Sequence, residues 1–238
     1  MRTLAIIPVK KVSKRLDNKN FLHVGDKPMF QLAIHLALQA RSLGVVDEVV
    51  LSYDDPHELL DAQNSVRLHR RPNALRNDIN HTTLQVVQDV LAPSESWGCV
   101  NGCASMIHNN PWDLICLLVP SSPLRTLNHI ISSRLLLHRE DDVAVMSVTT
   151  YRQDPRGAVV QGQQGCLRKI WPSDVIDDGT ALYKHCGTVI WAKSAWVLGA
   201  KSWYDSDRIR PFFVKPDEAI DVNDALDLVT ARRMAVQG

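Results

Sequence analysis

The sequence predicts an α/β fold, specifically a three-layer, mostly parallel, doubly wound sheet with a protruding arm. Short apolar runs typical of buried strands alternate with longer stretches that carry apolar residues at helical spacing. The pattern loosens over residues 151–185, between two well-defined apolar runs, as in an excursion from a sheet. We therefore expect one domain over residues 1–238, with residues 151–185 forming a lid or a dimerisation arm.

The predicted strands are apolar runs bounded by turn residues. The first, Thr3 to Val9, is almost continuously apolar, which is typical of a central strand covered on both faces. Further strands are expected at 45–52, 65–69, 114–119, 143–148 and 187–192, with short candidate strands at 158–160 and 166–170. Ligands of such sheets bind at the carboxyl ends of the strands, which directs attention to the segments that follow them.

Cap residues and apolar spacing predict helices between these strands. Pro28 opens a helix with apolar residues at three-and-four spacing, and Gly44 is placed to end it. A second helix is expected over 82–91, and Thr126 is a plausible N-cap for a third. Asp221 stands just before a final helix.

Composition restricts the class of protein. The chain has 238 residues, of which 45% are hydrophobic and 22% charged, enough for a packed core. Its 27 Lys and Arg nearly balance 26 Asp and Glu, without the basic excess of duplex-binding proteins, so we expect no nucleic-acid partner. The first apolar run is too short for a signal peptide or a membrane span. Five cysteines without metal-ligand spacing are expected to be free thiols, and we expect a cytoplasmic protein without membrane contact.

A basic loop follows the first predicted strand. Residues 10–20 carry five cations among small polar residues. At the carboxyl end of a buried strand, such a loop can direct backbone N–H groups and lysine ammonium groups at a triphosphate. The loop lacks the spacing of a P-loop, and an ordinary solvated loop is the alternative.

Several short motifs stand at predicted strand ends. They are Ile6-Ile7-Pro8-Val9-Lys10, Ser13-Lys14-Arg15-Leu16, Lys19-Asn20, Gly25-Asp26-Lys27-Pro28, Ser52-Tyr53-Asp54-Asp55, Arg71-Pro72 with Leu75 and Asp78, Pro120-Ser121-Ser122-Pro123-Leu124-Arg125-Thr126, Gly187, and Asp221-Val222-Asn223 with Asp227-Leu228. Together they resemble the signatures of the acylneuraminate cytidylyltransferase family, enzymes that make CMP-sialic acid and related CMP-sugars. The resemblance runs nearly end to end, and the block at 120–126 is its most specific part.

The resemblance implies a nucleotide-diphospho-sugar transferase-like, Rossmann-like fold and a nucleotidyltransferase. The anomeric hydroxyl of an acidic ulosonic, sialic acid-like sugar would attack the α-phosphate of CTP and release pyrophosphate, with Mg²⁺ as cofactor. Positioning and charge neutralisation dominate such phosphoryl transfers. The implied partners are CTP, an acidic sugar acceptor and a second copy of the chain in a homodimer.

The resemblance also implies roles for residues. The expected nucleotide-binding residues are Pro8, Lys10, Ser13, Lys14, Lys19, Asn20, Arg71 and Ser121. Those expected to be catalytic are Lys10, Lys19 and Asp221, and those expected to hold the metal are Asp221 and Asn223. Those expected to bind the acceptor are Ser122, Arg125 and Lys184. The alternatives are a capped helix start at residues 121–125 and a surface charge at Arg71.

Three departures from the family pattern lie on the sugar and metal side. Asn223 replaces a metal carboxylate, Val119 replaces a glutamine, and Cys186 replaces an asparagine. We expect weaker metal binding, unless Asp224 substitutes rather than capping the final helix, and an acceptor other than ordinary sialic acid. Two alternatives stay open: a catalytically impaired nucleotide-binding homologue, and a same-fold nucleotidyltransferase that uses another nucleotide or another acidic acceptor, such as a phosphonate.

The loosened segment is the candidate dimer contact. In the resembled family an equivalent excursion crosses to the partner, and cations suited to an acceptor carboxylate stand here at Arg152, Arg156, Arg168 and Lys169. A solvated hairpin is the alternative. The histidines show no spacing that indicates a role.

Overall fold

A seven-stranded sheet forms the centre of the computed structural model, which describes residues 1–11, 13, 15–54, 66–78, 80–92, 111–161, 166–170 and 179–236. The strand order is β11 (Ile209–Phe213), β7 (Ala144–Thr150), β10 (Tyr183–Lys193), β6 (Leu114–Leu117), β1 (Thr3–Val9), β4 (Glu48–Tyr53) and β5 (Arg67–Arg70). All neighbours pair in parallel except β10, which runs antiparallel to β6 and β7. The predicted, mostly parallel sheet is confirmed.

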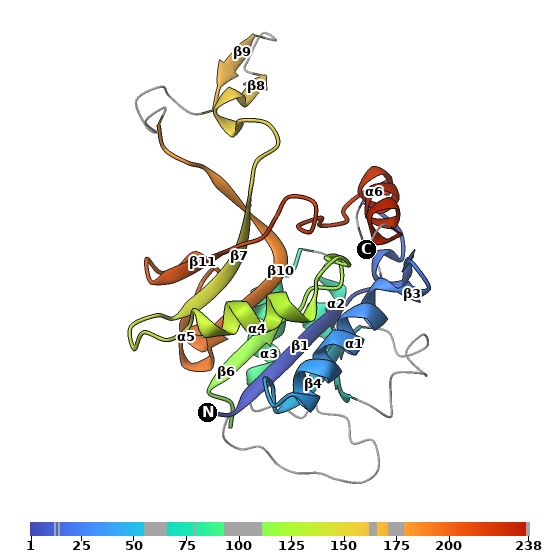
Figure 1. Ribbon diagram of the computed structural model, residues 1–238, viewed down its shortest axis with the longest axis vertical. Helices are drawn as coiled ribbons and strands as arrows, with labels where there is room; N and C mark the ends of the chain where they lie inside the picture. Colours follow the sequence, from blue (N-terminus) through green and yellow to red (C-terminus); the bar gives the residue numbers. More distant parts are fainter. Residues whose placement is uncertain are drawn as a thin grey trace.

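Helices cover both faces of the sheet, which confirms the three layers (Figure 1). Alternate residues of β1 point to opposite faces, so Ala5 and Ile7 pack with α1 (Met29–Ser42) and α4 (Leu127–Leu135). Leu4 and Ile6 pack with α3 (Thr83–Leu91) and α5 (Ser194–Gly199) on the other face. The remaining helices are the short α2 (Asn73–Asn77) and the final α6 (Ala225–Ala235). The latter packs beside β2 (His23–Val24), which pairs with β3 (Lys27–Pro28) in a separate two-stranded sheet.

The predicted helix signals are found at helix ends. Pro28 directly precedes α1, and Gly44 follows that helix with a φ of 69°, a left-handed conformation that favours glycine. Thr82 and Thr126 cap α3 and α4 through capping boxes, in which each threonine accepts from the backbone of the third helical residue.

Pro8 helps to open the sheet where β1 ends. The carbonyl of Ile6 accepts from the N–H of Leu118 at 3.0 Å, so Ile6 faces β6. In a strand, the backbone groups of residues two apart point to the same neighbouring strand, so those of Pro8 also point toward β6. The pairing of β1 with β6 ends at Ile6, so no hydrogen bond between the strands is lost because proline has no N–H. The space beyond this point lies at the carboxyl ends of β1 and β6.

The predicted arm is a hairpin of β8 (Val159–Gln161) and β9 (Leu167–Lys169) that projects from the far ends of β7 and β10 (Figure 1). Exposed apolar side chains stand on the hairpin and at its base, namely Tyr151, Val159, Leu167, Ile170 and Tyr183. In the described part of the chain, no helix is long and apolar enough to cross a membrane.

Candidate functional site

A cavity of about 390 Å³ lies at the carboxyl ends of β1, β5 and β6. Its lining includes seven of the eight predicted nucleotide-binding residues: Pro8, Lys10, Ser13, Lys19, Asn20, Arg71 and Ser121. The eighth, Lys14, lies outside the described residues. These side chains come from segments more than a hundred positions apart in sequence, and the parallel strand ends bring them together as predicted. We call this space the nucleotide cavity, after the role that the resemblance implies for these residues.

Two hydrogen bonds shape the basic loop at the mouth of this cavity. The side-chain amide of Asn20 donates to the carbonyl of Lys10 at 3.0 Å and closes the loop on itself. The backbone N–H of Lys11 donates to the Asp54 carboxylate at 3.0 Å, which ties the loop to the end of β4. Burial lowers the pKa of Lys19, although the nearby Asp221 carboxylate opposes this shift.

Arg71 is held beneath the nucleotide cavity and is only 2% exposed. Its Nε donates to the Ser52 hydroxyl at 3.2 Å, and its Nη2 donates to the Ser52 carbonyl at 3.0 Å. Its Nη1 is buried without a hydrogen-bond partner, so one donor of a cavity-lining guanidinium is left for a ligand. Burial lowers the pKa of Arg71 to about 10, so the group is still a cation at neutral pH. The alternative of a surface charge at this position is wrong.

A buried histidine supports the Arg71 contact. The Ser52 hydroxyl lies 3.2 Å from Nδ1 of His69. Because that hydroxyl accepts from Arg71, its own proton is free to point at Nδ1, which leaves the imidazole proton on Nε2. Nε2 lies 3.3 Å from the Asp89 carboxylate. Burial is the main cause that lowers the pKa of His69 to about 4, so the ring is neutral at physiological pH.

A second cavity, of about 630 Å³, lies between the base of the arm and the loop before α6. Three cations line it: Arg15, Arg152 and the predicted acceptor residue Lys184. Three carboxylates also line it, those of Asp221, Asp224 and Asp227. The buried Thr149 Oγ1 and His185 Nε2 have no hydrogen-bond partner. Arg15 lines both cavities and therefore stands between them.

Asp221 and Asn223 are adjacent in the wall of this second cavity. The Asn223 amide nitrogen donates to the Asp221 carboxylate at 2.8 Å, while its oxygen accepts from Arg15 at 2.7 Å and from Lys19 at 3.3 Å. Asp224 caps α6, and its side chain accepts from the backbone N–H of Asp227 at 2.9 Å. The capping interpretation of Asp224 is therefore confirmed.

The donor set fits a magnesium ion in part. No group of three or more His, Cys, Asp and Glu side chains among the described residues is arranged to hold a metal ion. Mg²⁺ is often held by one or two carboxylates together with substrate phosphates, and the Asp221 carboxylate fits that role. Asn223 presents its nitrogen to Asp221 and its oxygen to two cations, so its role as a metal ligand stays a prediction.

Ser122 and Arg125 are buried behind the site rather than in its lining. Arg125 donates to the carbonyls of Val119, at 2.6 Å, and of Thr188. The Ser122 hydroxyl donates to the carbonyl of Cys186 at 3.3 Å and would lie 3.1 Å from a Cβ at Gly187. These bonds tie the segment after β6 to β10, and an acceptor-binding role for the two residues stays a prediction.

Sequence reasoning missed several lining residues of the nucleotide cavity. His81 and Thr83 come from the start of α3, and Val86 comes from its first turns. The cap residue Thr82 was the available signal, since it fixes where this helix begins beside the cavity.

Comparisons with known proteins show which sequences and structures the chain is similar to. Residues 4–114 match the model of a family described as cytidylyltransferase. The chain is 25% identical over 242 aligned positions to the CMP-N,N'-diacetyllegionaminic acid synthase of Legionella pneumophila, covering 98% of this chain and 96% of that protein. It is 31% identical to a pseudaminic acid cytidylyltransferase of Campylobacter jejuni over 126 positions, which cover 52% of this chain and 48% of that protein.

Solved structures share the fold. One is a CMP:2-keto-3-deoxy-manno-octonic acid synthetase complexed with CTP, with a TM-score of 0.64, 16% identity, and coverage of 100% of this chain and 99% of that one. Another is the 4-diphosphocytidyl-2C-methyl-D-erythritol synthase of Anaerococcus prevotii, with a TM-score of 0.61, 12% identity, and coverage of 100% and 96%. The sequence matches confirm the family resemblance, and the structural matches confirm the fold.

Proposed function

We propose that this chain, which is similar to a CMP-N,N'-diacetyllegionaminic acid synthase and to pseudaminic acid cytidylyltransferases, transfers CMP from CTP to an acidic ulosonic sugar. It is a CTP-dependent cytidylyltransferase. The observation that carries this proposal is the nucleotide cavity, in which seven predicted residues meet beside the unpartnered Nη1 of Arg71.

In the proposed reaction the anomeric hydroxyl oxygen of the acceptor bonds to the α-phosphorus of CTP. The bond from that phosphorus to the bridging oxygen breaks, pyrophosphate leaves, and the hydroxyl proton passes to water. Negative charge develops on the phosphate oxygens, which Lys10 and Lys19 neutralise from fixed positions in the basic loop. Lys19 is partly buried, which strengthens this interaction because water screens its charge less than that of an exposed lysine.

Magnesium is part of the proposal. Asp221 would hold the ion together with phosphate oxygens of CTP, and the ion would supply further charge neutralisation. The chain contributes one carboxylate for this purpose, and Arg15 and Lys19 lie at Asn223, where a second carboxylate would stand. We therefore expect magnesium to bind weakly without nucleotide.

The second cavity is the proposed acceptor site. Its cations Arg15, Arg152 and Lys184 suit the carboxylate of an ulosonic acid. The unpartnered Thr149 hydroxyl and His185 Nε2 are available to the hydroxyl groups of a sugar. Named relatives act on legionaminic and pseudaminic acids, which makes acids of this class the first acceptors to test.

A homodimer through the arm completes the proposal. Isolated hairpins are marginally stable in water, and the β8–β9 hairpin exposes Val159 and Leu167 far from the sheet (Figure 1). A partner that covers these side chains would explain why they are apolar. Light scattering should give twice the monomer mass, and a monomeric mass at micromolar concentration would contradict this part of the proposal.

The central test measures CTP binding by calorimetry, and then pyrophosphate release with legionaminic, pseudaminic, sialic and 3-deoxy-octulosonic acids as acceptors. CTP should bind more tightly than UTP, ATP or GTP, and at least one acid should release pyrophosphate. Substitution of Lys10→Met should weaken CTP binding at least tenfold, because a charged donor to the phosphates is lost.

The matched control is Lys201→Met, because Lys201 is exposed and lines neither cavity. This variant should bind CTP as the wild type does. CTP binding without turnover on any acid would favour the impaired homologue, and absence of CTP binding would refute the proposed function.

A further inference from the structure

The segment that carries Asp221 is fixed at two backbone positions. This acidic loop, residues 214–224, joins β11 to α6. Near its start the N–H of Val214 donates to the carbonyl of Val148 at 2.9 Å, and near its end the N–H of Val222 donates to the carbonyl of Ser121 at 2.8 Å. Between them the chain makes a turn closed by the N–H of Glu218, which donates to the carbonyl of Lys215 at 3.0 Å.

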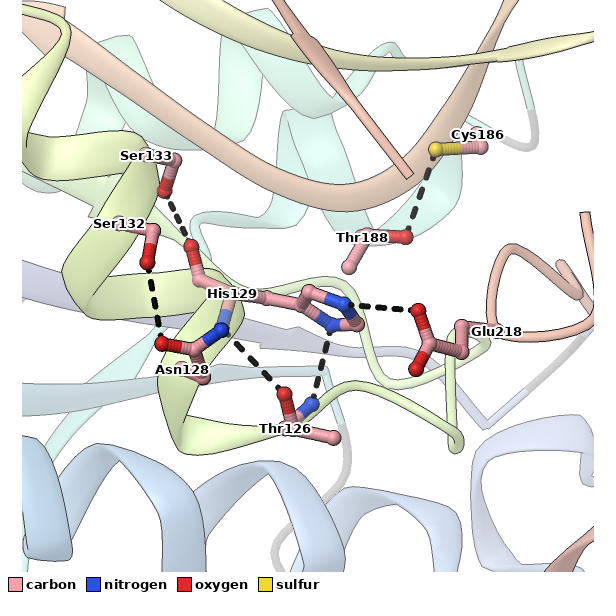
Figure 2. Close-up of polar contacts among 8 residues, drawn as sticks. All are labelled: Thr126, Asn128, His129, Ser132, Ser133, Cys186, Thr188 and Glu218. Atoms are coloured by element: carbon pink, nitrogen blue, oxygen red, sulfur yellow. Dashed lines mark hydrogen bonds and ion pairs between the residues drawn. The ribbon is translucent and has the colours of Figure 1, made fainter. Parts of the chain in front are cut away.

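Glu218, at the end of this turn, reaches a buried histidine on α4. Its carboxylate Oε2 lies 3.4 Å from Nε2 of His129. Figure 2 draws this contact as a dashed line. His129 is 6% exposed, and its ring packs edge-on against Phe212 of β11. A contact from a buried ring to a loop carboxylate is stronger than one between exposed groups, because water competes with it less.

The capping box of α4 fixes the orientation of this histidine. The backbone N–H of Thr126 donates to Nδ1 of His129 at 3.2 Å, so Nδ1 is the acceptor and the proton of the neutral ring is on Nε2 (Figure 2). That proton faces Glu218. One side chain therefore makes two contacts, one that begins the helix and one that reaches the acidic loop.

The helix itself is fixed to the sheet below the histidine. The indole N–H of the fully buried Trp191, in β10, lies 3.0 Å from the hydroxyl of Ser133 and 3.2 Å from the carbonyl of Ile130. The Ser133 hydroxyl in turn donates to the carbonyl of His129 at 2.5 Å. The histidine thus projects from a rigid support toward a loop.

We infer that His129 and Glu218 are positioning residues, a strut that holds the acidic loop, and with it Asp221, in place beside the segment that follows β6. The link to catalysis rests on the proposed function, in which Asp221 serves the magnesium–nucleotide complex. Neither residue lines the two cavities, so both act through the loop rather than on a ligand.

Three substitutions separate the strut from the capping box. Glu218→Ala removes the acceptor and leaves the capping box intact. His129→Glu keeps the capping box, because glutamate at this position also accepts from the backbone of the cap residue, but it places a second carboxylate against Glu218. Glu218→Gln is the conservative variant, because its amide oxygen still accepts from Nε2 of His129.

The first measurement is hydrogen exchange of the amides in residues 214–224, which needs no ligand. Glu218→Ala and His129→Glu should raise the exchange rates of the loop, including that of Val222, about tenfold, while Glu218→Gln should stay near the wild-type rates. Exchange in α4 should be unchanged in Glu218→Ala. Unchanged loop exchange in both disruptive variants would overturn the strut.

The second measurement is the dissociation constant for CTP with Mg²⁺ and with excess chelator. The two disruptive variants should lose most of the tightening that Mg²⁺ gives, roughly five- to tenfold, and should keep the affinity measured in chelator. An equal loss under both conditions would overturn the positioning role. If the wild type binds no CTP while loop exchange still rises in the variants, the strut stands and the proposed function fails.

Discussion

Arg15 donates a hydrogen bond of 2.7 Å from its guanidinium to the side-chain oxygen of Asn223, across a sequence separation of 208 residues. This bond connects the basic loop after β1 to the acidic loop before α6. Lys19 reaches the same oxygen at 3.3 Å. The neutral amide of Asn223 therefore accepts hydrogen bonds from two cations, at the point where the nucleotide cavity and the second cavity meet.

Asn223→Asp should tighten metal binding. The substitution keeps the acceptor for Arg15 and adds an anionic oxygen beside Asp221, so the affinity for Mn²⁺, measured by electron paramagnetic resonance in the presence of CTP, should rise about tenfold. The control Asn128→Asp adds the same charge on an exposed turn of α4 and should leave the affinity unchanged. Equal affinities in the two variants would contradict a metal beside Asp221.

Arg71→Lys should weaken CTP binding at least tenfold. Lysine cannot donate to Ser52 through two nitrogens and also offer a third donor to the cavity, as the guanidinium does. Calorimetric titration with CTP measures the loss. Arg233→Lys, on the exposed side of α6, is the matched control. A loss of twofold or less in Arg71→Lys would show that the unpartnered Nη1 does not meet the nucleotide.

Lys19→Met should weaken binding of CTP more than binding of CMP. If the ammonium meets the β- and γ-phosphates, its loss costs at least tenfold for the triphosphate and much less for the monophosphate. Competition titrations with the two nucleotides measure the difference. Equal losses for both would place Lys19 at the α-phosphate or outside the contact.

Acidification should destabilise the protein through His69. Burial lowers the pKa of this histidine from 6.5 to about 4, so between these values the unfolded chain binds a proton that the folded chain does not. Above pH 6.5 the titration of His69 does not reduce the free energy of unfolding. As the pH drops from 6.5 to 4, it lowers that free energy by about 3 kcal/mol. Urea unfolding at several pH values measures this slope.

His69→Asn should flatten that slope, because asparagine can still accept from Ser52 but does not titrate. Some slope should remain, since burial also lowers the pKa of His81, His129 and His185. A variant with the full wild-type slope would show that His69 is not the main titrating group.

Trp191→Phe should destabilise the fold by about 2 kcal/mol. Phenylalanine cannot donate to Ser133 or to the carbonyl of Ile130, and the smaller ring leaves space in a fully buried position. Chemical denaturation measures the loss. A change below 0.5 kcal/mol, roughly the effect of a surface substitution, would contradict the structural role of this indole.

The sequence predicted the parallel strands well, because a strand buried on both faces is a continuous apolar run. It did not predict the direction of β10, because an apolar run carries no direction and the reversal depends on the loosened segment before it. β11 was also missed. At the sheet edge it is only partly buried, so its residues show no continuous apolar pattern.

The part of the candidate site that the sequence predicted is the nucleotide cavity, where cationic side chains follow strand ends. The motifs predicted that Lys10, Lys19 and Arg71 lie together, and all three line this cavity. Ser122 and Arg125 belong to the most specific motif, yet their donors bond to backbone carbonyls. A motif records that a side chain is needed and does not record whether its partner is a ligand or the protein itself. The partner of His129 is 89 positions away in sequence, at Glu218, so spacing alone could not indicate the contact.

The two cavities divide the chain unequally. The nucleotide cavity is lined by residues 8–121, whereas the second cavity is lined by residues 149–230 together with Arg15. Exchange of the C-terminal part between relatives would therefore replace nearly all residues that line the second cavity. It would leave those that line the nucleotide cavity unchanged. Recombination downstream of residue 121 would change the side chains of the proposed acceptor site together with Asp221, so the proposed magnesium site would vary with the acceptor while the walls of the nucleotide cavity stayed the same.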